Sequence, residues 1–143
     1  MKLKKIVFIN CSDGGSTGKI IKDTAAYIST YDWTSVLCVP RIRQQNESCV
    51  RIRETSLKYE QGVYRRIAYL TGNLYGFEPL STHRILSVIR KEKPDIVHIH
   101  CTNGCTVNIY KLLAYLKKHD IATVVTNHAE FFYTGYCDHA NTC

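Results

Sequence analysis

The sequence predicts an α/β fold, with an open parallel sheet and flanking helices. Short runs rich in β-branched residues, typical of buried strands, occupy residues 4–10, 34–40, 95–100 and 122–128. Segments with apolar residues at helical spacing separate these runs, and such alternation favours a parallel sheet. The chain has 143 residues, 45% of them hydrophobic and 22% charged. We therefore expect a single domain over residues 1–143 with an ordinary globular core.

The first elements form a predicted β-α-β unit. The run "KIVFIN" predicts a buried strand, and Ile21, Ala25 and Ile28 share one face of a helix over residues 16–29. The run "TSVLCVP" predicts a second strand that stops at Pro40. Such units have right-handed crossovers and parallel strands.

Residues 41–80 are less regular. We expect a loop with a short strand over residues 41–53, then a helix over residues 56–72 that is interrupted at Gly62 and ends near Gly72. Residues 41–66 hold seven Lys or Arg and three Asp or Glu, and so carry much of the net charge of +7.

The alternation is clear again in the second half. A helix is predicted over residues 81–94, with Ser81 or Thr82 as its N-cap, and another over residues 107–120, whose basic last turn suits the helix dipole. With the strands at 95–100 and 122–128, the sheet has about four strands. Since ligands bind beyond the carboxyl ends of parallel strands, the loops after Asn10, His100 and His128 should share one edge.

The first of these loops, "NCSDGGSTGKI", has the composition of a phosphate-binding turn. An ATP-binding P-loop would need glycine where Asp13 stands and a hydroxyl where Ile20 stands. A dinucleotide fingerprint also fails at Asp13, and Arg41 stands near the place of the ribose-binding acid. Two alternatives remain, a tight turn without a ligand or helix N-terminal amides that face an anion.

Histidines flank the other two loops. We expect His98 and His100 to point to opposite faces of their strand. His98 would be a core histidine with its hydrogen bonds satisfied, and His100 would belong to the ligand site at the end of the strand. Asn103 and Gly104 follow in the edge loop and are candidates for holding substrate hydroxyls.

The number of cysteines and the net charge further limit the possible functions. The chain has seven cysteines, which is an odd number, and we find no export signal. We therefore expect thiols in the cytoplasm rather than a set of disulfides. A zinc site is a minor alternative, because the spacings match no common module; its ligands would be Cys101, Cys105, Cys137, His139 and Cys143. The charge favours an anionic partner, but no basic recognition helix points to nucleic acid.

Three segments together resemble the N-terminal domain of GT-B glycosyltransferases of family 4. They are "INCSDGGSTGKI", "KPDIVHIH" with "CTNG" after it, and "VVTNHAEFFYTGYC". The resemblance implies the N-terminal half of a two-domain enzyme, whose absent C-terminal domain holds most of a nucleotide-sugar donor. It implies a retaining transferase that needs no metal cofactor.

The resemblance also implies residue roles. Gly14 and Gly15 would approach the donor diphosphate, and His128 would act near the acceptor and the reacting sugar. The family often has aspartate after this histidine, whereas Ala129 and Glu130 follow it here. The catalytic candidate is His128. The substrate-binding candidates are Gly14, Gly15, Ser16, Thr17, His100, Asn103, Gly104 and Glu130.

The expected partners are a nucleotide-sugar and a glycan or lipid-linked acceptor, with peripheral contact at the inner face of the membrane. We expect this chain, as the acceptor-side part, to be inactive alone. The alternative is a stand-alone α/β module that binds a small phosphorylated ligand through the loop from Gly14 to Gly18.

Overall fold

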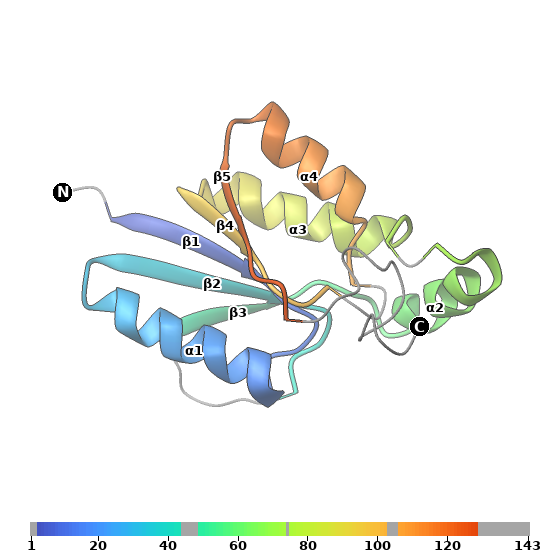
Figure 1. Cartoon of the computed structure of the whole chain (residues 1–143), viewed down its shortest axis with the longest axis horizontal. Coiled ribbons are helices and arrows are strands. Elements are labelled where there is room, and N and C mark those ends of the chain that lie inside the picture. Colours follow the sequence, from blue (N-terminus) through green and yellow to red (C-terminus); the bar gives the residue numbers. More distant parts are fainter. Residues whose placement is uncertain (1–2, 44–48, 74, 103–105, 129–143) are drawn as a thin grey trace.

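The computed structural model describes residues 3–43, 49–73, 75–102 and 106–128. Its centre is a five-stranded, all-parallel sheet in the order β3-β2-β1-β4-β5 (Figure 1). The strands are β1 (Lys4–Ile9), β2 (Trp33–Val39), β3 (Val50–Glu54), β4 (Ile96–Ile99) and β5 (Ala122–Val125). The helices are α1 (Gly15–Ser29), α2 (Glu60–Thr71), α3 (Pro79–Glu92) and α4 (Ile109–Lys118). The predicted fold class is therefore confirmed.

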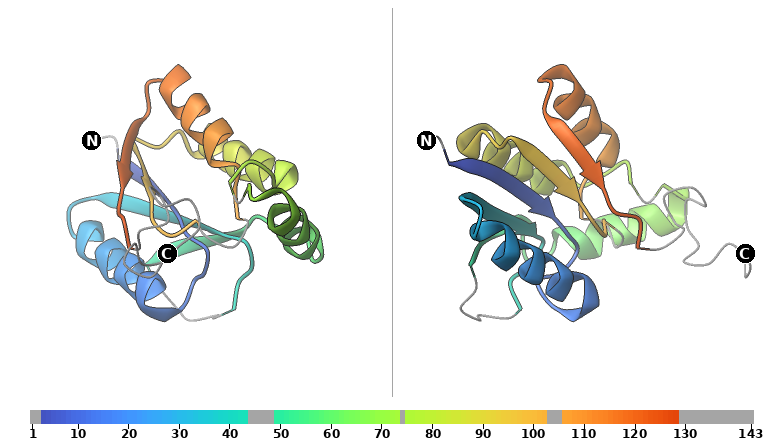
Figure 2. Two further views of the ribbon diagram at one scale, coloured as in Figure 1. Left: turned by 45° about the vertical axis from the view of Figure 1, so that its right-hand side comes forward. Right: turned by 60° about the vertical axis from the view of Figure 1, so that its left-hand side comes forward.

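The helices form layers on both faces of the sheet. Figures 1 and 2 show α1 on one face and the pair α3 and α4 on the other, while α2 lies past the carboxyl ends of the strands. In β1, Val7 and Ile9 belong to the core cluster under α3 and α4, whereas Ile6 and Phe8 pack with Ile21 of α1. A strand covered on both faces must be apolar at successive positions, and "IVFI" meets this requirement.

The two edges of the sheet differ from the prediction of about four strands. The short strand expected within residues 41–53 is β3, which pairs with β2 from Ser35↔Val50 to Val39↔Glu54 and adds a fifth strand. At the other edge, all four residues of β5 are exposed, including Val124 and Val125 at 44% and 49%. β5 ends at Val125, before the predicted end at residue 128.

Several helix ends also differ from prediction. α2 begins at Glu60, passes through Gly62 without a break and ends at Gly72 as expected. The N-cap of α3 is Glu78, followed by Pro79, so neither Ser81 nor Thr82 caps it. Proline's fixed φ and missing N–H suit the first position of a helix, which explains the earlier start. Within the described residues, no helix has both the length and the apolar character that crossing a membrane requires.

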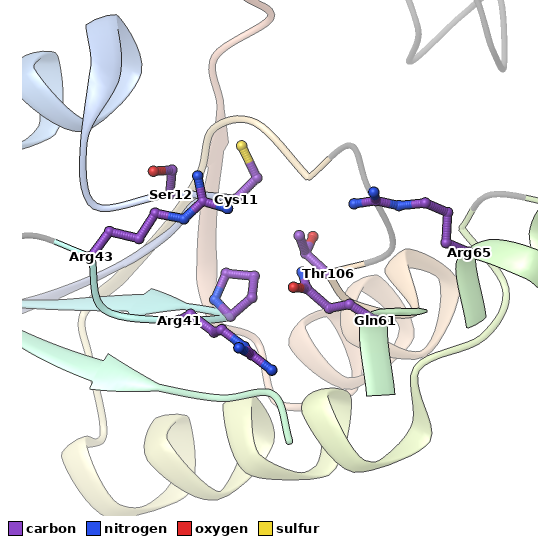
Figure 3. Close-up of a pocket in the computed structure, with 8 residues that line it drawn as sticks. Cys11, Ser12, Arg41, Arg43, Gln61, Arg65 and Thr106 are labelled. Carbon is purple, nitrogen blue, oxygen red and sulfur yellow. The ribbon is translucent and has the colours of Figure 1, made fainter. Parts of the chain in front are cut away.

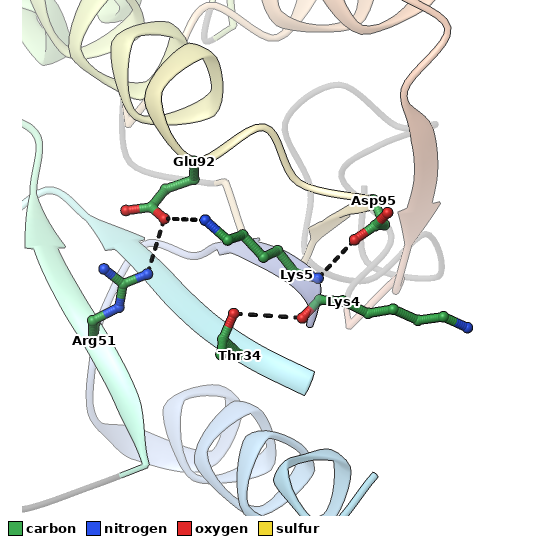
Figure 4. A network of polar contacts seen from close by, with 6 residues as sticks. All are labelled: Lys4, Lys5, Thr34, Arg51, Glu92 and Asp95. Atoms are coloured by element: carbon green, nitrogen blue, oxygen red, sulfur yellow. Dashed lines mark hydrogen bonds and ion pairs between the residues drawn. The ribbon is translucent and has the colours of Figure 1, made fainter. Parts of the chain in front are cut away.

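A charged cluster joins three elements near the amino ends of the strands (Figure 4). Glu92 of α3 accepts from Arg51 of β3 at 2.9 Å and from Lys5 of β1 at 3.4 Å. The hydrogen bond from Arg51, and then Lys5, hold the pKa of Glu92 below its ordinary 4.5. The pairing therefore contributes stability above about pH 4.5, and this contribution is lost as the pH falls through the lowered folded-state pKa.

A close approach of α1 to the loop before it gives a testable prediction. A Cβ on Gly18 would lie 2.6 Å from the carbonyl carbon and 2.7 Å from the carbonyl oxygen of Asp13. Because both atoms are backbone, Gly18→Ala should lower the free energy of unfolding by about 1–3 kcal/mol. The matched control is Gly62→Ala, where nothing lies within 4 Å of the added methyl group.

Urea unfolding of both variants is the measurement. Gly62→Ala should stabilise the protein by about 0.5–1 kcal/mol, since alanine loses less backbone entropy in a helix. Equal midpoints for the two variants would contradict the close approach.

Candidate functional site

Three loops meet at the carboxyl edge of the sheet, as the strand order requires. β1, β4 and β5 are neighbours, and their ladders continue one step beyond the strands through His100 N–H to Ile9 O and Thr126 N–H to Ile99 O. The glycine loop, His100 and His128 are therefore presented at the same edge.

Asn10, which is 1% exposed, ties these loops together. Its Oδ1 accepts the Cys101 N–H at 3.1 Å, and its Nδ2 donates to Ser12 O at 2.7 Å and to Thr17 Oγ1 at 3.0 Å. Its own N–H donates to Cys38 O. One amide side chain thus fixes the glycine loop, the start of α1 and the segment after β4 relative to one another.

The glycine loop is a built turn at the N-terminus of α1. Gly14 is the N-cap and its N–H donates to Ser12 Oγ, while Gly15 has φ of +69°, a conformation that favours glycine. The first amides of a helix have no intrahelical partners, and Gly15 and Ser16 are exposed here. The turn can therefore present N–H groups to an anion. Thr17 already accepts from Asn10, and substrate contact by these residues stays a prediction.

The histidines are arranged differently from the prediction. His98 and His100 do not point to opposite faces; their ring centroids lie 4.0 Å apart, and both rings lie beside Phe8. The physical reason is the strand repeat itself, because residues two apart share a face. His98 is half-buried, with its Nε2 2.7 Å from Thr126 Oγ1, so it is satisfied as expected.

His100 and His128 form a direct pair. Nδ1 of His100 lies 2.9 Å from Nε2 of His128, and the rings are stacked. His100 is 2% exposed, and its Nε2 has no hydrogen-bond partner among the described residues. Burial, then the nearby His98 and His128, lower the pKa of His100 to about 4. At neutral pH this ring is therefore uncharged and can hold His128 in one orientation through a single shared proton.

The thiols of the site are unsuited to nucleophilic chemistry. A hydrogen bond with Cys101, and then burial, raise the pKa of Cys11 well above its ordinary range, so this thiol stays protonated. Cys11, Cys38, Cys49 and Cys101 are thiols in this structure and are not joined in disulfides. Among the described residues, no group of three His, Cys, Asp or Glu could hold a metal ion. Four of the five zinc candidates lie outside the described residues, namely Cys105, Cys137, His139 and Cys143.

Some predicted site residues also lie outside the described part, namely Asn103, Gly104 and Glu130. Sequence reasoning missed Asn10 as the residue that joins the loops. It also missed a cavity of about 250 Å³ beside Cys11 and Ser12, lined by three arginines. The signal for the cavity was the excess of basic residues over 41–66, and the signal for Asn10 was a polar residue at the end of an apolar strand.

The role of Asn10 can be measured. Asn10→Ala leaves the buried Cys101 N–H and the Ser12 carbonyl without their partner, and we expect a loss of about 2–3 kcal/mol in the free energy of unfolding. The control is Asn73→Ala, because Asn73 is exposed and its side chain accepts, within the described residues, only from the Tyr75 N–H. This variant should lose less than about 1 kcal/mol. If both variants unfolded at the same urea concentration, Asn10 would not be the residue that holds the three loop segments together.

The buried His100 predicts a pH dependence. In the unfolded chain this ring takes up a proton near pH 6.5, whereas the folded ring does so only near pH 4. Acidification across this window therefore favours unfolding. His100→Gln should flatten the loss of stability between pH 6.5 and 4, whereas His83→Gln, on the exposed side of α3, should leave it unchanged. Denaturation at a series of pH values measures the slope, and an unaltered slope in His100→Gln would contradict a buried, neutral ring.

Comparison with known protein families identifies the family of this chain. A model described as Glycosyltransferase Family 4 matches residues 35–141, well over half of the chain. The matched range begins within β2 and contains β3 to β5 and both histidine segments of the resemblance, whereas the glycine loop precedes it. No curated protein and no solved structure gave a significant match. The parallel sheet agrees with the resemblance, and the chain belongs to glycosyltransferase family 4.

Proposed function

We propose that this domain is the acceptor-side part of a retaining glycosyltransferase. The enzyme transfers a sugar from a nucleotide-sugar to a hydroxyl of a glycan or of a lipid-linked acceptor. The observation that carries the proposal is the His100–His128 pair, which holds His128 2.9 Å from a buried, neutral ring at the carboxyl edge of the sheet. A histidine fixed in this way can hydrogen-bond a sugar hydroxyl or assist proton movement during transfer.

The glycine turn supplies the second part of the proposed chemistry. Amides at Gly14 and Gly15 would stabilise charge on the departing nucleotide diphosphate, since preorganised dipoles cost no reorganisation during the reaction. Asn10 connects this turn to the segment after β4. The glycine amides and that segment therefore keep their relative position. Most of the donor would be held by a second domain, and residues 1–143 alone would give little or no turnover.

Location at the inner face of a membrane is part of the proposal. Tyr69 and Leu70 of α2 are 80% and 83% exposed, and basic Arg65 and Arg66 stand one turn before them. Apolar side chains beside basic ones suit the surface of an anionic membrane.

A second candidate function is a stand-alone module that binds a small phosphorylated ligand. The built turn at Gly14 and Gly15 favours it, because that turn needs no second domain to present its amides.

The test expresses the complete reading frame and, separately, residues 1–143. Each is incubated with radiolabelled UDP-glucose, UDP-N-acetylglucosamine and GDP-mannose and with membrane extract as acceptor. We expect sugar transfer by the complete frame only, with retained anomeric configuration by NMR. His128→Ala should lower kcat by about 100-fold or more.

The matched control is His83→Ala, an exposed histidine of α3, which should leave kcat unchanged. Transfer by residues 1–143 alone would contradict the need for a donor domain. A complete frame that binds phosphorylated sugars without transferring them would favour the stand-alone module.

A further inference from the structure

The arginine cavity lies at the glycine loop, where Cys11 and Ser12 line it, and its other walls come from the segment after β2, from α2 and from Thr106 (Figure 3). Its volume is about 250 Å³, and Figure 3 shows Arg43 and Arg65 extending toward it from opposite sides. Arg41 and Arg43 follow β2 and are two apart in the chain, whereas Gln61 and Arg65 are one turn apart on α2 and share a helix face. The remaining wall is formed by Cys11, Ser12, Pro40 and Thr106.

Among the described residues, no acidic side chain lines this cavity. The ion pairs found in the same part of the chain join Glu92 to Lys5 and Arg51, so none of the three cavity arginines has a carboxylate within salt-bridge distance there. Guanidinium groups on the walls of one cavity repel one another, and an anion between them would reduce this repulsion.

Two contacts fix the Arg41 side chain and the backbone of Arg43 before any ligand binds. Arg41 donates through Nη2 to the backbone carbonyl of Lys58, which joins the segment after β2 to the approach to α2. The Arg43 N–H donates at 2.9 Å to Oδ2 of Asp13, a residue that is completely buried. The cavity is therefore part of the fold, and Asp13, which excludes a P-loop, anchors one of its walls.

The lining favours phosphate. Guanidinium groups bind phosphate oxygens through paired N–H donors, and a doubly charged phosphate monoester matches several arginines better than a single carboxylate does. The hydroxyls of Ser12 and Thr106 and the amide of Gln61 add neutral hydrogen-bonding groups to the same wall. The volume leaves room for part of the molecule that carries the phosphate.

The cavity adjoins the glycine turn, because Cys11 and Ser12 line it and Ser12 Oγ accepts from the Gly14 N–H. Its three arginines come instead from the segment after β2 and from α2. Competition with UDP therefore distinguishes an acceptor phosphate in the cavity from the donor diphosphate. We propose that the cavity binds a phosphate group of the acceptor. The acceptor assignment rests on the proposed function, but phosphate binding can be measured without any turnover.

The test titrates the full chain with glycerol 3-phosphate by isothermal calorimetry, with glycerol as the uncharged reference. Arg43→Gln and Arg65→Gln should each weaken binding by about tenfold or more, since each removes a charge-assisted contact. The matched control is Arg84→Gln, which changes an exposed arginine of α3 outside the cavity. Circular dichroism of each variant excludes loss of the fold as the cause of weak binding.

Opposite results would overturn the proposal. Equal binding of glycerol and glycerol 3-phosphate, or unchanged affinity in both cavity variants, would show that the arginines bind no phosphate. Competition by UDP that requires Arg43 and Arg65 would assign the cavity to the donor instead. If the complete reading frame transferred no sugar but the arginine dependence held, the proposed function would fail while the phosphate site stood.

A vesicle assay identifies the carrier of the phosphate. Vesicles of phosphatidylcholine and phosphatidic acid in equal parts are compared with phosphatidylcholine alone. Co-sedimentation that needs phosphatidic acid, Arg43 and Arg65 would support a lipid headgroup. Binding of glycerol 3-phosphate without co-sedimentation would support a soluble phosphorylated acceptor.

Discussion

One buried amide, that of Asn10, sets the geometry on which the candidate site depends. Parallel strands bring their carboxyl ends to one edge, but strand pairing alone leaves the loops beyond them free to choose their conformations. Asn10 removes that freedom because it bonds at once to the loop after β1, to the first turn of α1 and to the segment after β4. An aspartate there would lack the donors, and an apolar residue would leave the partners unsatisfied.

The two sides of this edge differ in charge, and the difference suits a two-substrate reaction. Toward β4 and β5, burial and then the neighbouring histidine rings lower the pKa of His100, so this ring adds no charge at neutral pH. Toward β2 and α2, three arginines line a cavity that has no acidic side chain among the described residues. A neutral side tolerates sugar hydroxyls, and a positive side attracts phosphate, so position along the edge alone can order two ligands.

The sequence predicted what periodicity controls. Strand and helix order, the end of α2 at Gly72 and the shared edge followed from apolar spacing and glycine position. It could not predict Asn10, because its partners lie up to 91 residues away, at Cys101. The opposite-face assignment of His98 and His100 was wrong because it misapplied the strand repeat. Glu78 as N-cap was missed because a residue with φ of +57° has no sequence signal of its own.

The exposed strand β5 has a consequence for how this protein behaves in solution. Among the described residues, Ala122–Val125 is an outer strand with exposed apolar side chains, and such strands are templates for pairing with other chains. The net charge of +7 keeps copies of the chain apart by mutual repulsion. Salt screens this repulsion and leaves the strand edge unchanged, so the solubility of the chain falls as ionic strength rises.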